Sequence, residues 1–528
     1  MDYKELGLKF RESCRDEHDL FRRSLSNVES VQSKKLIDIV SRNSSSVIGN
    51  KYEFSDIKSV DEFRSRVPVS TYEDYGDYIG RISKGEKRVL TTEDVLMLEP
   101  TSGSTSASKL IPYTESLRGE FHAGIFPWLY DLMDNVSGLI DGSFYWSITP
   151  AANRNSVSEG EIPIGFGDDS TYFSNEQIGY VLGLSPVPHS VSGILDMEEF
   201  RFSTLGHLLG NEELSFISIW NPTFLPLLFR PLEENPKEAI QRVGDRKRRD
   251  WLENLFKKDL SSSERYSEIW PNVSLISCWA SGNSKNYVPE IQKMFPDVLI
   301  QGKGLLATEG FVTLPIIGED GCALSINSHF FEFRDIETRN LSLAHEVTEG
   351  KQYEVIMTTG SGLYRYNLGD IVRVNGFLEE CPLLEFEGRG NMVSDLFGEK
   401  LNERHVADSI RSSLDGIGID ASFFMISPED LDDKTSYTLF IEGNAKLEEL
   451  SLLRESLEKR LKDNFHYNYC RNFGQLGSLE IFQIEEGNAT DIYLGEKMRE
   501  GKKLGDIKPS ALDSGRNWSS KFYGSFIK

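Results

Sequence analysis

Residues 95–113 constrain the fold and the chemistry of this chain more than any other stretch. An apolar run, 95–98, is followed by a loop rich in serine and threonine that ends at Lys109. Small residues let backbone N–H groups approach an anion, hydroxyls add donors, and a lysine adds charge. This order predicts a strand, a phosphate-binding loop, and then a helix over 114–134 whose N-terminus faces the anion. It is not a Walker A loop, because Leu110 follows the lysine, and the alternative is a flexible surface turn.

The length of 528 residues exceeds what one hydrophobic core usually supports, so two or more domains are expected. Hydrophobic residues make up 39% of the chain, and the formal net charge is −25. These values indicate a soluble globular protein and argue against nucleic acid as a partner. The basic run 246–249 is the local exception, and the favoured interpretation is a solvated helix face.

The sequence contains no recognisable secretory signal and no apolar stretch long enough to span a bilayer. We therefore expect a cytoplasmic protein without a membrane partner, and a monomer. The five cysteines are far apart and form no C-x-x-C pair, and the eight histidines are scattered. This spacing predicts reduced thiols and disfavours a zinc site.

The apolar periodicity predicts an α/β protein with a large N-terminal domain. Residues 1–45 have helical spacing. Short apolar runs at 144–148, 180–182, 216–220 and 273–278 indicate strands between helical segments. A helix over 288–295 and a strand over 298–301 follow the last of these runs, which predicts a βαβ unit.

A change of pattern after residue 311 predicts a β-rich subdomain over about 311–375. Two glycines around a charged residue at 386–391 are typical of a hinge, so we place a boundary between domains 1–388 and 389–528. The second domain is predicted to be a small, mobile α+β lid. Its expected elements are helices over 402–414 and 447–465, the second capped by Asn444, and strands over 422–426, 435–441 and 478–484.

Three further stretches carry candidate functional groups. Thr308 and Glu309 follow the βαβ unit at a strand-to-loop junction, where ligands of open α/β sheets bind. The segment 362–370 ends at Asp370, an acid able to hold a ribose diol. Lys400 and Lys508 place positive charge in the second domain. Each also has an ordinary interpretation: a surface acid, a turn former, or a solvated lysine.

The order of these stretches resembles the adenylate-forming superfamily. The loop of that superfamily reads two hydroxyl residues, glycine, two hydroxyl residues, glycine, two variable residues and lysine, and residues 101–109 match it closely. Within the superfamily the chain resembles the auxin-responsive Gretchen Hagen family of acyl acid amido synthetases. The resemblance spans nearly the whole chain, and its most specific part is Thr-Thr-Gly-Ser-Gly-Leu-Tyr-Arg-Tyr-Asn-Leu-Gly-Asp at 358–370.

The resemblance implies an ATP-dependent ligase that requires Mg²⁺. It activates a carboxylic acid as acyl-AMP, releases pyrophosphate, and transfers the acyl group to the amine of an amino acid. It implies a nucleotide site made of Ser102, Gly103, Ser104, Thr105, Lys109, Thr308, Glu309, Tyr364, Asp370 and Arg389. Glu309 would be the magnesium ligand, Asp370 and Arg389 would reach the ribose, and Lys400 and Lys508 would approach the α-phosphate, so the implied catalytic residues are Lys400, Lys508 and Glu309.

The chain also departs from the family pattern. Ser106 replaces a glycine of the loop, and Leu305 and Leu306 replace residues that include an aromatic able to stack on adenine. For the acid we predict a site between the helix after the phosphate loop and region 307–333, with Arg118, Phe121, His122, Trp128 and His329 as candidates. The alternatives are an acyl-CoA synthetase of the same superfamily and a catalytically inactive nucleotide-binding relative.

Overall fold

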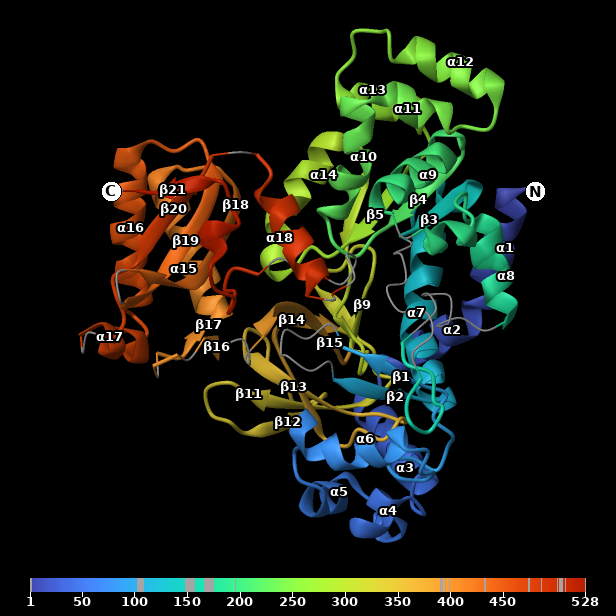
Figure 1. The fold of residues 1–528 in the computed structure, drawn as a ribbon. Coiled ribbons are helices and arrows are strands. Elements are labelled where there is room, and N and C mark those ends of the chain that lie inside the picture. The colour runs from blue at the N-terminus through green and yellow to red at the C-terminus, as the bar shows by residue number, and fades with distance from the viewer. Residues whose placement is uncertain are drawn as a thin grey trace. The chain divides into compact units, whose positions relative to one another are not determined.

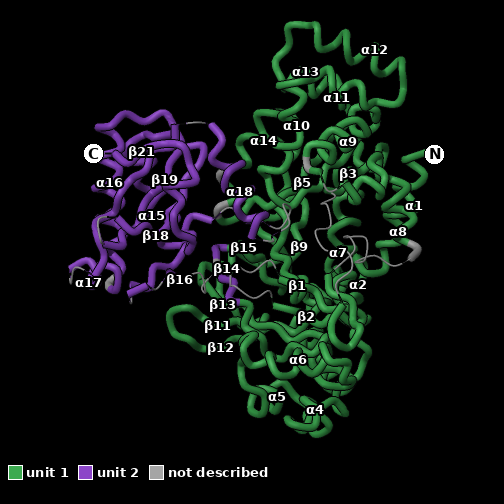
Figure 2. The backbone as a smooth tube through the Cα atoms, in the orientation of Figure 1, with its two compact units in different colours: residues 1–368, 372–386 green, residues 369–371, 387–528 purple. Residues whose placement is uncertain are grey.

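The computed structural model describes residues 2–101, 109–147, 157–165, 175–194, 196–389, 393–394, 396–397, 399–431, 434–472, 475–485, 487–500, 502, 507–508 and 510–527. The chain forms two compact units (Figure 2). Unit 1 comprises residues 1–368 and 372–386, and unit 2 comprises residues 369–371 and 387–528. The chain passes from unit 1 to unit 2 at residue 387, two residues before the predicted boundary.

Helices occupy the first part of unit 1 (Figure 1). They are α1 (Tyr3–Ser13), α2 (Arg15–Ser24), α3 (Val28–Arg42), α4 (Val47–Lys51), α5 (Val60–Arg66) and α6 (Gly76–Ser83). Side chains that accept from backbone N–H groups define several starts: Asp2 caps α1, Ser46 caps α4 and Ser59 caps α5. The prediction of helices over 1–45 is confirmed. Phe10 and Phe21 of these helices are fully buried, so the helices belong to the core of unit 1.

The Ser/Thr-rich loop lies between two antiparallel strands, and this differs from the prediction. β1 (Met97–Pro100) pairs with β2 (Leu110–Tyr113), and only then does α7 (Glu115–Asn135) begin, capped by Thr114. The predicted strand and the predicted helix both exist. The order strand, loop, helix was wrong, because the short apolar run 110–113 forms a strand that separates the loop from the helix N-terminus.

A four-stranded parallel sheet follows, with strand order β3-β4-β5-β6. Its strands are β3 (Ser143–Trp146), β4 (Leu214–Ser218), β5 (Leu275–Cys278) and β6 (Leu299–Gly302). The helices between them are α8 (Asn175–Leu184), α9 (Met197–Leu209), α10 (Phe224–Glu234), α11 (Pro236–Gln241), α12 (Arg246–Leu255), α13 (Ser262–Ile269) and α14 (Val288–Met294). Every residue of β4 and β5 is buried, as expected for parallel strands covered on both faces.

The predicted βαβ unit is confirmed by the neighbouring parallel strands β5 and β6, with α14 between them in the chain. The strand predicted at 180–182 is wrong, because these residues lie in α8. The basic run 246–249 does lie in a helix, α12, but Arg248 is buried. Its guanidinium donates to the carbonyl oxygens of Leu209 and Ile269, so this arginine is a structural residue and not part of a solvated face.

The β-rich part of unit 1 is a seven-stranded sheet with strand order β12-β11-β13-β14-β15-β10-β9. Its strands are β9 (Thr313–Pro315), β10 (Cys322–Leu324), β11 (Phe330–Asp335), β12 (Leu341–Leu343), β13 (Gln352–Thr358), β14 (Tyr366–Leu378) and β15 (Cys381–Arg389). It extends past the predicted end at 375, because β14 and β15 are long neighbouring strands. A small antiparallel pair, β7 (Leu306–Ala307) and β8 (Gly310–Phe311), precedes it in the chain.

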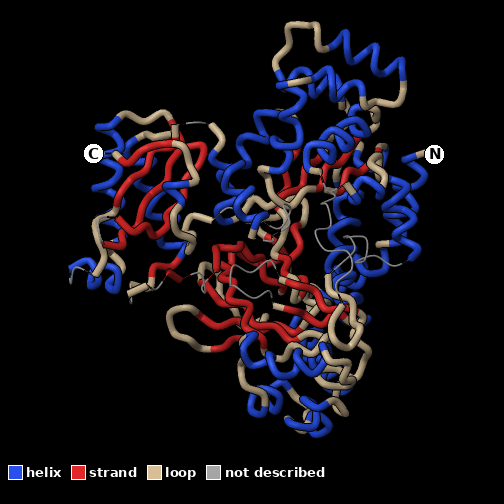
Figure 3. Tube along the Cα trace, in the orientation of Figure 1, coloured by secondary structure: helices blue, strands red, loops and turns tan. Residues whose placement is uncertain are grey.

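Unit 2 is built on a four-stranded sheet with strand order β18-β19-β20-β21 (Figure 3). The strands are β18 (Ala421–Leu431), β19 (Lys434–Gly443), β20 (Glu480–Ile484) and β21 (Gly524–Phe526); a separate pair is β16 (Val393–Ser394) and β17 (Leu401–Asn402). The helices are α15 (Glu403–Ile417), α16 (Leu447–Leu461), α17 (Phe465–Asn472) and α18 (Ala489–Arg499). Leucines of α16 are buried against this sheet, as the helical spacing predicted, although the N-cap is Lys446 and not Asn444.

None of the helices in the described ranges is both long and apolar enough to cross a bilayer. All five cysteines are free thiols, as predicted, and four of them are buried. Burial raises the pKa of the Cys14 and Cys278 thiols to about 12, so both are protonated at neutral pH.

Candidate active site

The ends of the Ser/Thr-rich loop are held together by the hairpin that carries it. The Thr101 N–H donates to the carbonyl oxygen of Lys109 at 2.8 Å, which continues the pairing of β1 and β2 by one step. The predicted phosphate contacts Ser102, Gly103, Ser104 and Thr105 lie outside the described residues, as does Ser106. Seven residues, 102–108, therefore stand in the chain between Thr101 and Lys109.

Lys109 lies against the ring of Tyr72, with its Nζ 5.1 Å from the ring centroid. The Tyr72 hydroxyl accepts the Leu110 N–H at 2.7 Å, so this tyrosine is fixed to the strand that follows the loop. Burial raises the pKa of the Tyr72 hydroxyl, and the negative charge of Glu309 adds to this effect. Tyr72 therefore contacts the lysine that closes the loop, and the charge of the acid predicted to bind magnesium acts on its hydroxyl.

Thr308 and Glu309 form the two-residue turn between β7 and β8, in which Ala307 pairs with Gly310. Gly310 is required there, because an added Cβ would come within 2.3 Å of Met357 Cε and 2.5 Å of His329 Nε2. The Glu309 side chain is 8% exposed, and its Oε1 accepts the Tyr366 hydroxyl at 3.1 Å. The turn and this hydrogen bond together fix the orientation of the Glu309 carboxylate.

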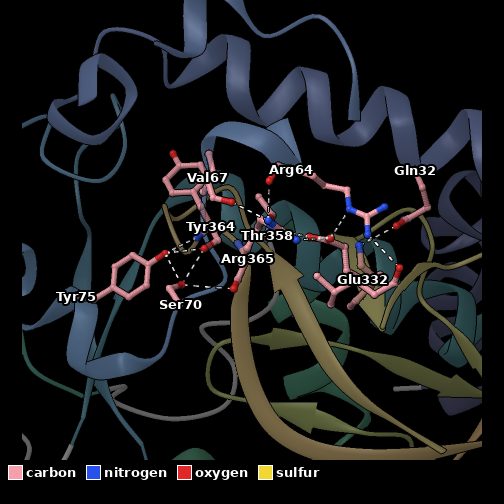
Figure 4. A network of polar contacts seen from close by, with 11 residues as sticks. Gln32, Arg64, Val67, Ser70, Tyr75, Glu332, Thr358, Tyr364 and Arg365 are labelled. Atoms are coloured by element: carbon pink, nitrogen blue, oxygen red, sulfur yellow. Dashed lines mark hydrogen bonds and ion pairs between the residues drawn. The ribbon is translucent and has the colours of Figure 1, made fainter. Parts of the chain in front are cut away.

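Within the motif 358–370, residues 359–365 form a buried loop that leads from β13 into β14 (Figure 4). Gly362 has φ 103°, a backbone conformation that favours glycine, and an added Cβ would lie 2.5 Å from Leu90 Cβ. Arg365 also has a positive φ, 50°, and its guanidinium forms a bidentate pair with Glu332 (Nε–Oε2 2.7 Å, Nη2–Oε1 2.9 Å). This buried pair holds the backbone immediately before Tyr366.

Hydrogen bonds to the N-terminal helical region complete this network (Figure 4). The Arg365 Nη1 donates to the Val67 carbonyl oxygen at 2.7 Å, and the Arg64 Nε lies 3.2 Å from Glu332. The Ser70 N–H donates to the Arg365 carbonyl oxygen at 3.0 Å, and the Asn367 N–H donates to the Ser70 carbonyl oxygen at 2.9 Å. The Tyr366 position is therefore determined by segments that are about 300 residues apart in the sequence.

Two residues of this motif, Tyr364 and Asp370, were predicted to bind nucleotide. The Tyr364 side chain is fully buried, and its hydroxyl donates to the Leu90 carbonyl oxygen at 2.9 Å. That side chain fills the core, and its nucleotide contact stays a prediction. Asp370 lies inside β14 and is 1% exposed. Its ribose contact stays a prediction.

Three of the five candidates for the acid site are buried, among them Trp128, whose Nε1 donates to Gln301 Oε1 at 2.9 Å. Phe121 is 1% exposed and packs edge-on against Phe311, and His329 is fully buried. His329 Nε2 accepts the Phe311 N–H at 3.0 Å, and its Nδ1 lies 2.9 Å from Glu120 Oε2. Phe121 and His329 are thus buried in the core, and their contact with the acid stays a prediction.

The other two candidates, Arg118 and His122, are partly exposed on α7. Arg118 forms an ion pair with Glu115 at 2.6 Å, and His122 stacks on Phe126 with ring centroids 4.6 Å apart. They remain candidates for the acid site.

In unit 2, a buried carboxylate holds the loop that carries Lys400. Glu399 is fully buried and accepts the N–H groups of Leu396 and Phe397 at 2.8 Å each, while the Tyr437 hydroxyl donates to it at 2.5 Å. Lys400 itself has φ 45°, and its carbonyl oxygen accepts the Asn464 amide at 3.0 Å. A lysine in the left-handed region costs roughly 1–3 kcal/mol and indicates that its surroundings impose its conformation.

Glu403, three residues after Lys400, also holds the segment that follows Lys508. Its Oε1 accepts the Ser510 hydroxyl at 2.7 Å and the Ala511 N–H at 3.2 Å. The Ala511 carbonyl oxygen also accepts the Ile426 N–H of β18 at 2.8 Å. One carboxylate therefore joins the segments of the two predicted lid lysines. Arg389 is the last residue of β15, and its side chain lies outside the description.

Sequence reasoning missed Tyr72, Tyr366 and Glu403 as site residues. Tyr366 stands within the specific motif 358–370, but its partner Glu309 is 57 positions away in the chain. Tyr72 and Glu403 carry no local pattern that distinguishes them from ordinary surface residues. Their roles arise only from contacts between distant segments.

The hydroxyl of Tyr366 gives a direct test of this geometry. Tyr366→Phe is expected to raise the KM for Mg·ATP about tenfold, because a buried hydrogen bond to a charged acceptor contributes about 1.5–3 kcal/mol. The measurement is pyrophosphate release against ATP concentration. Tyr353→Phe is the matched control, because Tyr353 is equally buried and its hydroxyl accepts the Thr348 N–H outside the site. Equal KM values for both variants and the wild type would contradict the role of Tyr366.

The fold and the site define the class of protein. Models of the GH3 family match the chain in three parts: the N-terminal domain at residues 17–300, the central domain at 322–389 and the C-terminal domain at 404–514. The chain therefore belongs to the GH3 family, and the predicted resemblance and fold class are confirmed.

Individual relatives are amino acid-conjugating synthetases. The jasmonoyl-L-amino acid synthetase GH3.5 of Oryza sativa subsp. japonica is 24% identical over 537 residues, covering 91% of each chain. The indole-3-acetic acid-amido synthetase GH3.4 of Arabidopsis thaliana is 24% identical, covering 73% of this chain and 71% of its own. The solved structure of GH3.15 acyl acid amido synthetase has a TM-score of 0.81 at 19% identity, covering 96% of this chain and 97% of that one, and therefore shares the fold.

Proposed function

We propose that this protein is an ATP-dependent acyl acid amido synthetase. It activates a carboxylic acid as acyl-AMP with release of pyrophosphate, and then transfers the acyl group to the amine of an amino acid. The observation that supports the proposal most is the convergence of Lys109, Tyr72, Glu309 and Tyr366 from four segments of unit 1 in a GH3 chain. Relatives in this family are named for such conjugations.

In the first half-reaction the acid's carboxylate attacks the α-phosphorus of ATP, and the bond to pyrophosphate breaks. Negative charge accumulates on the phosphate oxygens. Lys109 and the N–H groups of the loop neutralise this charge, and such preorganised donors contribute about 3–4 kcal/mol each in other enzymes. Asp370 and Arg389 hold the ribose, and Lys508 supplies further positive charge.

The residues present fit a nucleotide-borne magnesium ion. Mg²⁺ keeps several waters and takes one or two protein carboxylates in addition to phosphate oxygens. Glu309 supplies one such carboxylate, oriented by the Tyr366 hydroxyl. When bound, the ion would withdraw charge from the phosphates. Among the described residues, no cluster of three side chains of metal-binding type occurs.

In the second half-reaction the amine of an amino acid attacks the acyl carbon and AMP leaves. Lys400 and Lys508 belong to segments joined by Glu403, so one unit can serve both steps with different lysines. A monomer in the cytoplasm is the state in which we expect this reaction to occur.

An ATP–pyrophosphate exchange assay over a library of carboxylic acids tests the proposal. We expect exchange with at least one acid, and an amide product when amino acids are added. Lys109→Ala is expected to lower exchange about a hundredfold or more. Lys87→Ala is the control, because Lys87 lies on the surface, paired only with Asp94 through side chains that are 75% and 71% exposed. A thioester formed with CoA and no amide would indicate an acyl-CoA synthetase, and ATP binding without exchange would indicate an inactive relative.

A further inference from the structure

The side chains of two consecutive residues, Ser328 and His329, hold the backbone of Phe311. His329 Nε2 accepts the Phe311 N–H at 3.0 Å, and the Ser328 hydroxyl donates to the Phe311 carbonyl oxygen at 3.0 Å. Both residues are fully buried. Phe311 pairs with Leu306 across the hairpin whose turn carries Glu309. The two side chains therefore fix the strand that leaves this turn.

A buried carboxylate extends these contacts to the motif 358–370. An imidazole that accepts a hydrogen bond at Nε2 carries its one proton on Nδ1. In His329 this nitrogen lies 2.9 Å from Oε2 of Glu120, a residue of α7 that is 3% exposed. Both carboxylate oxygens of Glu120 accept the Gly360 N–H at 2.9 Å. Glycine suits this close approach, because an added Cβ would lie 2.7 Å from Ser116 Cβ.

Glu309 is thus held from two directions that meet in the core. On one side, the chain leads from Glu309 through β8 to Phe311, whose N–H donates to His329. On the other side, the Tyr366 hydroxyl donates to Glu309 Oε1, and the motif leads back from Tyr366 to Gly360. Since the buried carboxylate lies against His329 and accepts from Gly360, these contacts form a closed ring. Supporting contacts of this kind keep a functional side chain in one orientation.

We propose that His329, together with Glu120 and Ser328, is a positioning residue that fixes the Glu309 carboxylate for the magnesium ion of Mg·ATP. This inference rests on the proposed function, which assigns that ion to Glu309. His329 acts through the backbone of Phe311 and not through contact with the nucleotide. Replacing a residue that orients a metal ligand typically costs about 10–100-fold in metal affinity or activity.

Equilibrium binding of ATP in the absence of any acid tests this role without a reaction. The ratio of the Kd in EDTA to the Kd in Mg²⁺ measures what the ion adds to ATP binding. His329→Phe removes the acceptor at Nε2 and is expected to lower this ratio about tenfold. His329→Gln, which keeps an acceptor oxygen near the Nε2 position, should recover most of it. Phe333→Leu is the control, because Phe333 is equally buried on β11 but packs edge-on against Tyr353.

A double variant shows whether His329 acts through Glu309. Glu309→Gln alone should lower the ratio, and adding His329→Phe should then change it less than about twofold, because the ligand to be positioned is already lost. Hydrogen–deuterium exchange of peptides that contain Phe311 gives a structural readout. Exchange should be faster in His329→Phe than in the wild type, and close to the wild type in His329→Gln.

The outcomes separate the two proposals. The positioning role is overturned if the wild type binds ATP equally well in Mg²⁺ and in EDTA, if His329→Phe keeps the wild-type ratio, or if the double variant loses a further factor. If His329→Phe is unfolded by circular dichroism, Ser328→Ala replaces it, because it removes the donor to the Phe311 carbonyl oxygen and should lower the same ratio. Absence of pyrophosphate exchange with every acid overturns the synthetase instead, and the binding ratio does not depend on that assay.

Discussion

Arg365→Met is expected to lower the free energy of unfolding by about 3–5 kcal/mol, the cost of removing one partner of a buried ion pair. Arg365 and Glu332 are 4% and 1% exposed, and they form two charge-assisted hydrogen bonds. Without the guanidinium, the Glu332 carboxylate keeps its ion pair with the partly exposed Arg64, and the Val67 carbonyl oxygen loses the hydrogen bond from Arg365. Urea denaturation followed by circular dichroism measures the change.

The control for this experiment is an arginine at the surface. Arg242 makes an equally short bidentate pair with Glu199, but these side chains are 39% and 45% exposed. Arg242→Ala should therefore cost about 1 kcal/mol or less. Combining Arg365→Met with Glu332→Leu should recover part of the loss, since no buried charge then remains unpaired. A loss in Arg365→Met as small as that of Arg242→Ala would show that the pair does not hold the segment before Tyr366.

Lys508→Ala is expected to lower acyl-adenylate formation about a hundred- to thousandfold while the protein remains folded. The physical reason is the loss of one positive charge that the proposed mechanism assigns to the reacting phosphate. Single-turnover release of pyrophosphate measures this step alone. Lys434→Ala, at an exposed lysine on β19, should leave the rate unchanged. Unchanged pyrophosphate release in Lys508→Ala would refute the assignment.

Glu403 provides a second test of the same assignment. Its carboxylate accepts from Ser510 and Ala511, so it holds the backbone that follows Lys508. Glu403→Ala should reproduce part of the defect of Lys508→Ala, whereas Glu403→Gln, which keeps an acceptor oxygen, should recover most of the rate. Equal defects in the two Glu403 variants would show that the charge of Glu403, and not its hydrogen bonds, is what matters.

Most of the secondary structure could be predicted because it follows local patterns. The leucines of α16 recur at helical spacing, and the βαβ unit is indicated by a helical segment between two apolar runs. The failures are short apolar segments. Residues 110–113 form strand β2, and residues 180–182 are part of α8. A run of three or four apolar residues is too short to show a period, so its secondary structure depends on the segments that it packs against.

The sequence alone determined the family, the phosphate-loop motif and the acid Glu309, because these depend on residue types in a fixed order along the chain. Only the tertiary structure decided which side chains serve the core and which serve the site. His329, Phe121 and Tyr364 lie in the core, whereas Tyr72 contacts Lys109 and Tyr366 contacts Glu309, two residues that the sequence proposes for the site. Burial and hydrogen bonding depend on segments hundreds of residues apart, and no local pattern records which of those segments meet.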